Sequence, residues 1–246
     1  MNLNHLPSKE PNIRVGIILP IDKMTKVDIV LSDSDSFEID SEEKLYPSCK
    51  NLNKLSIITT ESGLRLDVLK CISKKISIKP IIKSENTFIT LKNVIAGRGF
   101  HWQKQIDVKY WGKIDFTIID NKLLAINEVK LEDYLKCVAT SEMSQNCPKE
   151  FLISQTIVAR SWILANIEQK HSELNFDVCN DDCCQRYQGI NNCSDKSIEA
   201  ANNSYGKVLI YGDQICDTRY SKSCGGITEN FENVWENKQV PYLRSI

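Results

Sequence analysis

Short apolar runs separated by polar turn residues fill the first half of the chain. Between Arg14 and about Ile126 these runs are rich in Val, Ile and Thr, as in VGIILPI, KVDIVL, LSIITT, TFITL and KIDFTIID. Runs of this length and composition are typical of β-strands. The sequence therefore predicts a strand-rich region over residues 15–126.

The period of the pattern changes after residue 130. Leu131, Leu135 and Val138 recur at helical spacing, and four residues further on the same face reaches Glu142. A carboxylate on an apolar face is costly, so it must be paired, protonated or at the mouth of a cleft. Each of these environments changes the pKa of the carboxyl group, which makes Glu142 a candidate for acid/base chemistry.

A second helix is predicted directly after the first. Ser144 to Pro148 interrupts the helical spacing, which resumes from Lys149 to about Lys170. We therefore expect a helical hairpin over residues 131–168. The predicted fold class is α+β, with a strand-rich N-terminal half, this hairpin, and a mixed C-terminal part that forms a substrate cleft.

Composition and charge bear on whether the protein binds nucleic acid or crosses a membrane. The 246 residues are 41% hydrophobic and 26% charged, as in ordinary globular proteins, and 31 Lys and Arg against 32 Asp and Glu give a net charge of -1. Such a balance provides no overall basic field for nucleic acid. No run approaches the roughly 18 to 20 apolar residues that span a bilayer, and MNLNHLPSKEPNIR lacks the apolar region of a signal peptide.

The ten cysteines concentrate late in the chain, where Cys179, Cys183 and Cys184 form a C-x3-C-C pattern. The pairing of cysteines cannot be fixed from their spacing. Buried thiols, disulfides and a metal site are all compatible with the pattern, and His171 is a further candidate ligand.

The hairpin region and several later blocks resemble one family. NEVKLEDYLKCVATSEM and EFLISQTIVARSWIL are similar to the signature of the SpoIID/LytB family, also called the stage II sporulation protein D family. The resemblance continues in the same order at FDVCNDDCCQRYQG, AANNSYGKVLIY, YSKSCGGITEN and VWENKQVPYL. It covers about half of the chain, residues 118–243, whereas the first 90 or so residues match only in their strand-rich character.

The resemblance implies a peptidoglycan lytic transglycosylase. Such enzymes cleave the bond between N-acetylmuramic acid and N-acetylglucosamine and leave a 1,6-anhydro end, and the family's essential glutamate falls on Glu142. One carboxyl group serves as both acid and base, because the muramic C6 hydroxyl is the nucleophile. The alternative is a binding protein of the amidase-enhancer type, which uses the same cleft without turnover.

The resemblance also implies substrate contacts. We expect Gln155 and Arg160 to orient Glu142 or to touch the glycan, although a structural ion pair is equally expected for Arg160. Hydroxyls and paired glycines suit sugar recognition because they offer hydrogen bonds and close backbone approach. The remaining candidate substrate-binding residues are Gln185, Tyr187, Tyr220, Ser221, Ser223, Gly225, Gly226 and Thr228.

Some family members hold zinc near the segment that matches Cys179 to Cys184. Cys179 and Cys184 fall where the family often places its cysteines, and Cys183 stands where other members often have a histidine or another polar residue. With His171 as a further candidate, these four residues could hold a structural zinc that braces the cleft wall. A disulfide or free thiols remain the alternative at this point. No cofactor is expected for the chemistry itself.

The predicted organisation is a flexible leader over 1–14, the strand-rich domain over 15–126 and a SpoIID-like catalytic region over 127–246. In that region cleft-lining loops and strands occupy 171–246. The expected partners are peptidoglycan glycan strands and an N-acetylmuramoyl-L-alanine amidase, with no nucleic acid. Because the substrate lies outside the cytoplasm, we expect an extracytoplasmic location and a precursor whose leader is absent from this sequence.

Overall fold

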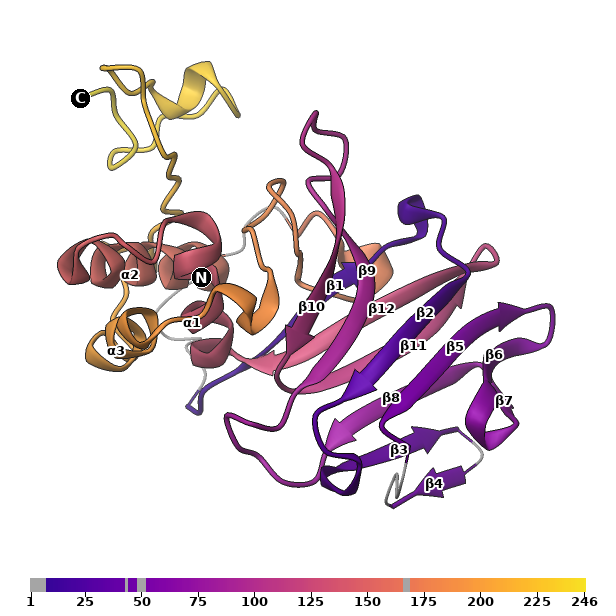
Figure 1. Cartoon of the computed structure of the whole chain (residues 1–246). Helices are drawn as coiled ribbons and strands as arrows, with labels where there is room; N and C mark the ends of the chain where they lie inside the picture. Colours follow the sequence, from indigo (N-terminus) through magenta and orange to yellow (C-terminus); the bar gives the residue numbers. More distant parts are fainter. Residues whose placement is uncertain (1–7, 43, 48–51, 166–168) are drawn as a thin grey trace.

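Two β-sheets and a group of helices make up the fold in a computed structural model of the chain (Figure 1). The structure describes residues 8–42, 44–47, 52–165 and 169–246. Within these residues strands and helices occupy separate regions, which confirms the α+β class. None of the helices in the described ranges is long and apolar enough to cross a membrane.

The larger sheet places strands from both halves of the chain side by side. Its order in the described part is β13 (Val178–Cys179), β1 (Asn12–Ile18), β12 (Lys122–Lys130), β11 (Lys113–Ile119), β8 (Lys75–Pro80), β3 (Phe37–Ser41) and β4 (Lys44–Tyr46). β1 is antiparallel to β12 and parallel to β13. The segment that contains β13 therefore pairs with the first strand of the chain.

The second sheet is antiparallel and closes the core from the other side. Its order over the same residues is β10 (Lys104–Tyr110), β9 (Ile89–Ala96), β2 (Lys26–Leu31), β5 (Lys54–Thr60), β6 (Gly63–Leu66) and β7 (Cys71–Ser73). In β2 the residues Val27, Ile29 and Leu31 are buried, and the residues between them are more exposed. This alternation places one face of the strand in the core.

One hydrophobic core joins the sheets to the helices. It includes Ile57 and Ile78 from the sheets and Leu135, Val138 and Ile163 from the helices, all of them buried. β12 runs across the predicted domain boundary at residues 126 and 127 without interruption. β1 begins at Asn12, so residues 12–14 of the predicted leader belong to the sheet, while residues 1–7 lie outside the described residues.

The helical hairpin follows directly from β12 and begins at the predicted residue 131, while its predicted end at 166–168 lies outside the described residues. α1 spans Leu131–Glu142 and α2 spans Lys149–Ala165. α3 (Asp195–Asn203) packs against both, and the three helices lie together beside the sheets (Figure 1). A short hairpin of β14 (Ile210–Tyr211) and β15 (Gln214–Ile215) precedes the C-terminal segment, which lies beyond α2 in Figure 1.

Candidate active site

Glu142 is the last residue of α1, where its carboxyl group meets two other segments. Its Oε1 atom accepts a hydrogen bond from the backbone N–H of Arg186 at 2.7 Å and one from the hydroxyl of Tyr220 at 3.3 Å. Leu131, Leu135 and Val138 on the same face are buried, as the periodicity predicted. The side chain of Glu142 therefore lies at the edge of the core and not on a solvated helix face.

The environment of Glu142 favours its protonated form. Burial raises the pKa of this carboxyl group above its usual value, and the charge of nearby Asp182 acts in the same direction. The hydrogen bonds from Arg186 and Tyr220 oppose the shift without cancelling it. Such a carboxyl group keeps its proton to a higher pH than an exposed glutamate and suits general acid catalysis.

Two open grooves meet at Glu142. One has a volume of about 350 Å³ and the other of about 340 Å³, and both are lined by Glu142, Met143 and Lys222. The first is also lined by Trp162, Lys170, Asp182, Cys183, Cys184, Arg219, Tyr220, Ser221 and Trp235. The second also has Thr140, Ser141, Ser144, Gln145, Arg186, Gln188 and Asn192. A linear polymer lying across Glu142 has a groove on either side of the carboxyl group.

Arg186 is fixed beside Glu142 by an aromatic ring from the other half of the chain. Its guanidinium lies 4.6 Å from the centroid of the Trp102 ring, a cation–π contact. Trp102 covers Gly97, whose φ is +74°, and a Cβ at Gly97 would lie 2.4 Å from the Trp102 ring. Glycine at this position therefore lets the indole pack against the backbone and support Arg186.

A buried charge network joins the same two loops. Arg98 forms an ion pair with Asp22 at 2.6 Å and donates to the side chain of Asn180 at 2.6 Å. The carboxylate of Asp181 accepts the backbone N–H groups of Gly97 and Arg98 at 3.1 and 2.7 Å. The strand-rich half of the chain thus holds the 180–186 loop, from which Arg186 reaches Glu142.

Gln185 and Tyr187 lie in the core next to the site. Both are fully buried: Gln185 accepts from the hydroxyl of Tyr134 at 3.0 Å, and Tyr187 donates to Asn127 at 2.8 Å. Neither side chain lines a groove at Glu142. Their polar atoms are used inside the core, which favours a structural role over the predicted contact with substrate.

Arg160 is a structural residue as well. It is 0% exposed and forms a bidentate pair with Glu132, with nitrogen–oxygen distances of 2.8 and 2.6 Å. A third bond goes to the backbone carbonyl of Lys207 at 3.0 Å. The ion pair is one of the two roles expected from the sequence, and it connects α1 to α2 and to the segment after α3.

Gln155 is buried like Arg160, but its side chain is close to Glu142. It is buried, and its side-chain amide contacts the hydroxyl of Tyr220, which itself donates to Glu142. The amide nitrogen has no hydrogen-bond partner within the described part of the chain. The position of Gln155 favours orientation of Glu142 through Tyr220 over direct contact with a glycan.

The candidate substrate-binding residues between Tyr220 and Thr228 fall into two groups. Tyr220 and Ser221 line a groove at Glu142. Ser223, Gly225, Gly226 and Thr228 do not line either groove, and their contact with substrate stays a prediction. Thr228 instead pairs with the end of the chain, where its backbone N–H donates to the carbonyl of Ile246 at 3.2 Å. The two glycines do have positive φ, as expected for a turn.

The four candidate metal ligands lie together. The side-chain donor atoms of His171, Cys179, Cys183 and Cys184 all lie within 4.8 Å of one another. Hydrogen bonds from Cys179 and Cys184, together with His171, lower the pKa of the Cys183 thiol. Among the described cysteines all are free, so the structure forms no disulfide in this cluster. The cluster borders the groove through Cys183 and Cys184.

Several groove residues were not identified from the sequence. Arg186, Asp182, Lys222 and Trp235 all line the grooves, and Arg98 and Asp181 hold the loop beneath them. Their positions depend on contacts between distant segments, which no local pattern reports. A weak signal lies in the charged residue between two glycines at 97–99.

Fold and site together define an α+β protein with a half-buried carboxyl group at the junction of two grooves and a thiol–imidazole cluster at their edge. The model of the family described as "SpoIID: Stage II sporulation protein" matches residues 119–211. Over these residues, the chain is similar to the SpoIID family. The family is named for sporulation, and a curated relative carries the same name.

Two curated proteins are similar to the chain. An uncharacterized protein of Brachyspira hyodysenteriae is 31% identical over 139 residues, which cover 56% of this chain and 38% of that protein. "Stage II sporulation protein D" of Bacillus subtilis is 26% identical over 142 residues, which cover 50% of this chain and 39% of that protein. The matched region thus spans less than half of either relative.

Proposed function

We propose that this protein is a peptidoglycan lytic transglycosylase. It cleaves the bond between N-acetylmuramic acid and N-acetylglucosamine in glycan strands whose stem peptides an amidase has removed, and it leaves 1,6-anhydro ends. The observation that carries the proposal is the carboxyl group of Glu142, which has a raised pKa and stands where two grooves meet. The family relationship of residues 119–211 supports the same substrate class.

The proposed chemistry uses Glu142 twice. Its protonated carboxyl group gives a proton to the leaving glycosidic oxygen and then, as a carboxylate, takes the proton of the muramic C6 hydroxyl as that oxygen attacks the anomeric carbon. The N–H of Arg186 and the hydroxyl of Tyr220 both donate to Oε1 and stabilise the carboxylate after the first transfer. Because the described residues donate to Oε1 and not to Oε2, we assign the proton to Oε2.

The groove walls suit a sugar polymer. Trp162 and Trp235 line one groove and offer apolar faces, and Arg186 and Asn192 line the other and offer hydrogen-bond donors. Lys222 brings positive charge to both grooves, whereas Arg219 is paired with Asp217 at 2.7 Å and lies 4.8 Å from the centroid of the Trp235 ring. A free muramic carboxylate, exposed once stem peptides are removed, is a suitable ligand for such a charge.

Ordinary hydrolysis is the competing chemistry, because a second carboxyl group, that of Asp182, lines the same groove. Incubation of the protein with denuded glycan and mass analysis of the products distinguishes the two. Our proposal predicts 1,6-anhydromuramic ends, which weigh one water less than reducing ends. It also predicts that Asp182→Asn still forms them. Reducing ends would establish hydrolysis, and binding without any product would establish the enhancer class.

We also propose that the thiol–imidazole cluster holds a structural zinc. A tetrahedral zinc with bonds to sulfur of about 2.3 Å places its sulfur ligands about 3.8 Å apart. Here Cys183 and Cys184 are 3.9 Å apart, and the Nε2 of His171 lies 3.8 and 3.4 Å from their sulfurs. Cys179 is closer, 3.0 Å from Cys183. With zinc bound, these residues tie the segment after α2 to β13 and to the groove edge.

Metal analysis after purification without chelators tests the zinc proposal. We expect one zinc per chain, and a loss of that zinc in His171→Gln and Cys183→Ser. Cys224→Ser is the matched control, because Cys224 is exposed and outside the cluster. Wild-type protein that contains no stoichiometric zinc would contradict the proposal and leave the cluster as thiols or a disulfide.

The proposed location follows from the substrate. Peptidoglycan lies outside the cytoplasmic membrane, so we propose that the protein acts there, after an N-acetylmuramoyl-L-alanine amidase has removed the stem peptides. Fractionation of cells that express the complete protein tests this, with a cytoplasmic enzyme as marker. Recovery with the cytoplasmic marker would contradict the proposed location.

A further inference from the structure

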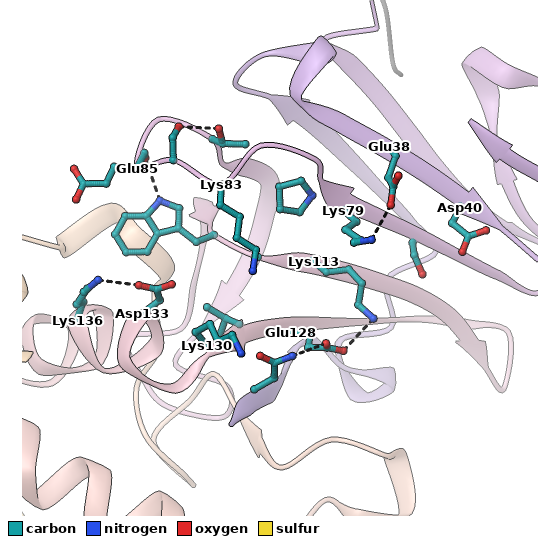
Figure 2. A pocket seen from close by; sticks show the side chains of 18 of the residues that line it. Glu38, Asp40, Lys79, Lys83, Glu85, Lys113, Glu128, Lys130, Asp133 and Lys136 are labelled. Atoms are coloured by element: carbon teal, nitrogen blue, oxygen red, sulfur yellow. Dashed lines mark hydrogen bonds and ion pairs between the residues drawn. The ribbon is translucent and has the colours of Figure 1, made fainter. Parts of the chain in front are cut away.

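A cavity of about 650 Å³ lies at the opposite end of α1 from Glu142. Its floor is formed by side chains of β3, β8, β11 and β12, and its wall by the loop after β8, Trp111 and the first turns of α1 (Figure 2). From Asp133, which lines it, α1 runs about 13 Å to Glu142 at 1.5 Å per residue. The cavity shares no lining residue with the two grooves.

The floor carries charges that are mostly paired across the strands. Lys79 stands opposite Glu38 and pairs with it at 2.9 Å, and Lys113 stands opposite Glu128 and pairs with it at 3.0 Å. Beside Ser77, Asp115 is buried, with the cationic nitrogens of Lys113, Arg14 and Lys75 within 3.3 to 3.6 Å. Arg14 also pairs with Glu128, at 3.2 Å, so three cations face the two carboxylates of Asp115 and Glu128 and leave one positive charge.

Two further lysines add positive charge without a carboxylate partner. Lys83 has no hydrogen bond or ion pair to any described residue, and Lys130 donates only to the backbone carbonyl of Glu10, at 3.3 Å. Both ammonium groups point into the cavity in Figure 2, whereas Asp40 and Glu85 lie at its two edges. The centre of the cavity therefore presents cations that no acidic side chain neutralises.

We propose that this cavity binds the carboxylate or phosphate group of an anionic ligand of about disaccharide size. Lys83 and Lys130 supply the charge, and Trp111 and Pro80 supply apolar surface for the rest of the ligand. The volume lies within the range of about 300 to 1,000 Å³ that is usual for ligand pockets. The cavity is separate from the grooves at Glu142, so a test of this site does not depend on the proposed glycan cleavage.

Lysine acetylation of the whole wild-type chain, followed by peptide mass spectrometry, tests this site. The probes are inorganic phosphate and N-acetylmuramic acid, with neutral N-acetylglucosamine as control and sodium chloride to equalise ionic strength. We expect one or both anions to slow acetylation of Lys83 and Lys130, and no change at Lys54 and Lys104, which lie outside the cavity. The anion that slows acetylation of Lys83 and Lys130 shows whether the site binds a phosphate or a carboxylate group. Equal rates with and without both anions would overturn the proposal.

Calorimetric titration with the protecting anion gives a second test. We expect Lys83→Gln/Lys130→Gln to bind at least about tenfold more weakly than wild type, a loss of about 1.4 kcal/mol. The double variant Lys54→Gln/Lys104→Gln carries the same change of net charge and should bind as wild type does. Equal weakening in both double variants would show a general charge effect and overturn the site.

Discussion

At the scale of single residues, the pKa of Glu142 decides the pH range of the proposed activity. The general acid must be protonated, so activity falls as pH rises through the raised pKa of Glu142. The hydrogen bond from Tyr220 lowers that pKa and the charge of Asp182 raises it. These two neighbours therefore act on the same limb of the pH profile in opposite directions.

We expect Tyr220→Phe to move the alkaline limb of the pH–activity profile to higher pH and Asp182→Asn to move it to lower pH. Profiles of product formation on denuded glycan measure both shifts, and the direction is the readout because either change can also alter the absolute rate. Shifts of the same sign in the two variants, or an unmoved limb in both, would contradict the assignment of this limb to Glu142.

Arg160 makes a residue-scale prediction about stability. Arg160→Met leaves Glu132 buried without its cation, and removal of one partner of a buried pair costs about 3–5 kcal/mol. We expect a loss of that size in urea unfolding, with much of it recovered in Arg160→Met/Glu132→Leu. A loss below about 1 kcal/mol, in the range of exposed ion pairs, would contradict the structural role.

At the scale of elements, Gly189 lets the turn before α3 approach β10 closely, and Asn191 in the same turn forms hydrogen bonds with that strand. Gly189 has φ +53°, and a Cβ there would lie 2.0 Å from the backbone carbonyl oxygen of Lys109. Alanine must both adopt a left-handed conformation and displace β10, so the turn and the strand cannot keep their contact. This turn carries Asn192, which lines a groove at Glu142.

We expect Gly189→Ala to lower the free energy of unfolding by more than about 2 kcal/mol, because conformational strain and a backbone clash add. Gly206→Ala is the matched control: φ is +67° but the space around it is open, so only the cost of the conformation, about 1 kcal/mol, is expected. Chemical unfolding measures both. Equal losses in the two variants would show that the contact with Lys109 contributes nothing.

Element boundaries were predicted well where periodicity was strong. The hairpin and the buried face that ends in Glu142 follow from helical spacing alone, and α1 and α2 occupy the predicted residues. Arg186 and Asp181 had no such signal, because their roles come from loops that meet only in the folded chain. Gln185 and Tyr187 matched a family block, yet sequence could not show that their polar groups are used inside the core.

At the scale of the whole molecule, the strand-rich half and the SpoIID segment share one core. β12 crosses residue 126, and buried residues on both sides of it pack in the same cluster. The site depends on this union, because Trp102 and Arg98 hold the loop that reaches Glu142. The strand-rich half is therefore part of the active-site scaffold.

A chain that begins at residue 127 should not fold cooperatively, since it lacks β1, the strand that pairs with both β12 and β13. We expect no sharp thermal transition and rapid proteolysis, while the described chain from residue 8 onward gives one transition. Two independent transitions in the longer chain, or a cooperative fragment 127–246, would instead support separate domains.

The most direct test of the account compares wild type with Glu142→Gln on denuded glycan. Glutamine keeps the size and the hydrogen-bond acceptor at Oε1 but cannot transfer a proton, so we predict at least about a hundredfold loss of 1,6-anhydromuramic ends with an unchanged thermal transition. Glu150→Gln, on the exposed side of α2, is the matched control and should act as wild type does. Equal formation of anhydro ends by wild type and Glu142→Gln would contradict the central claim.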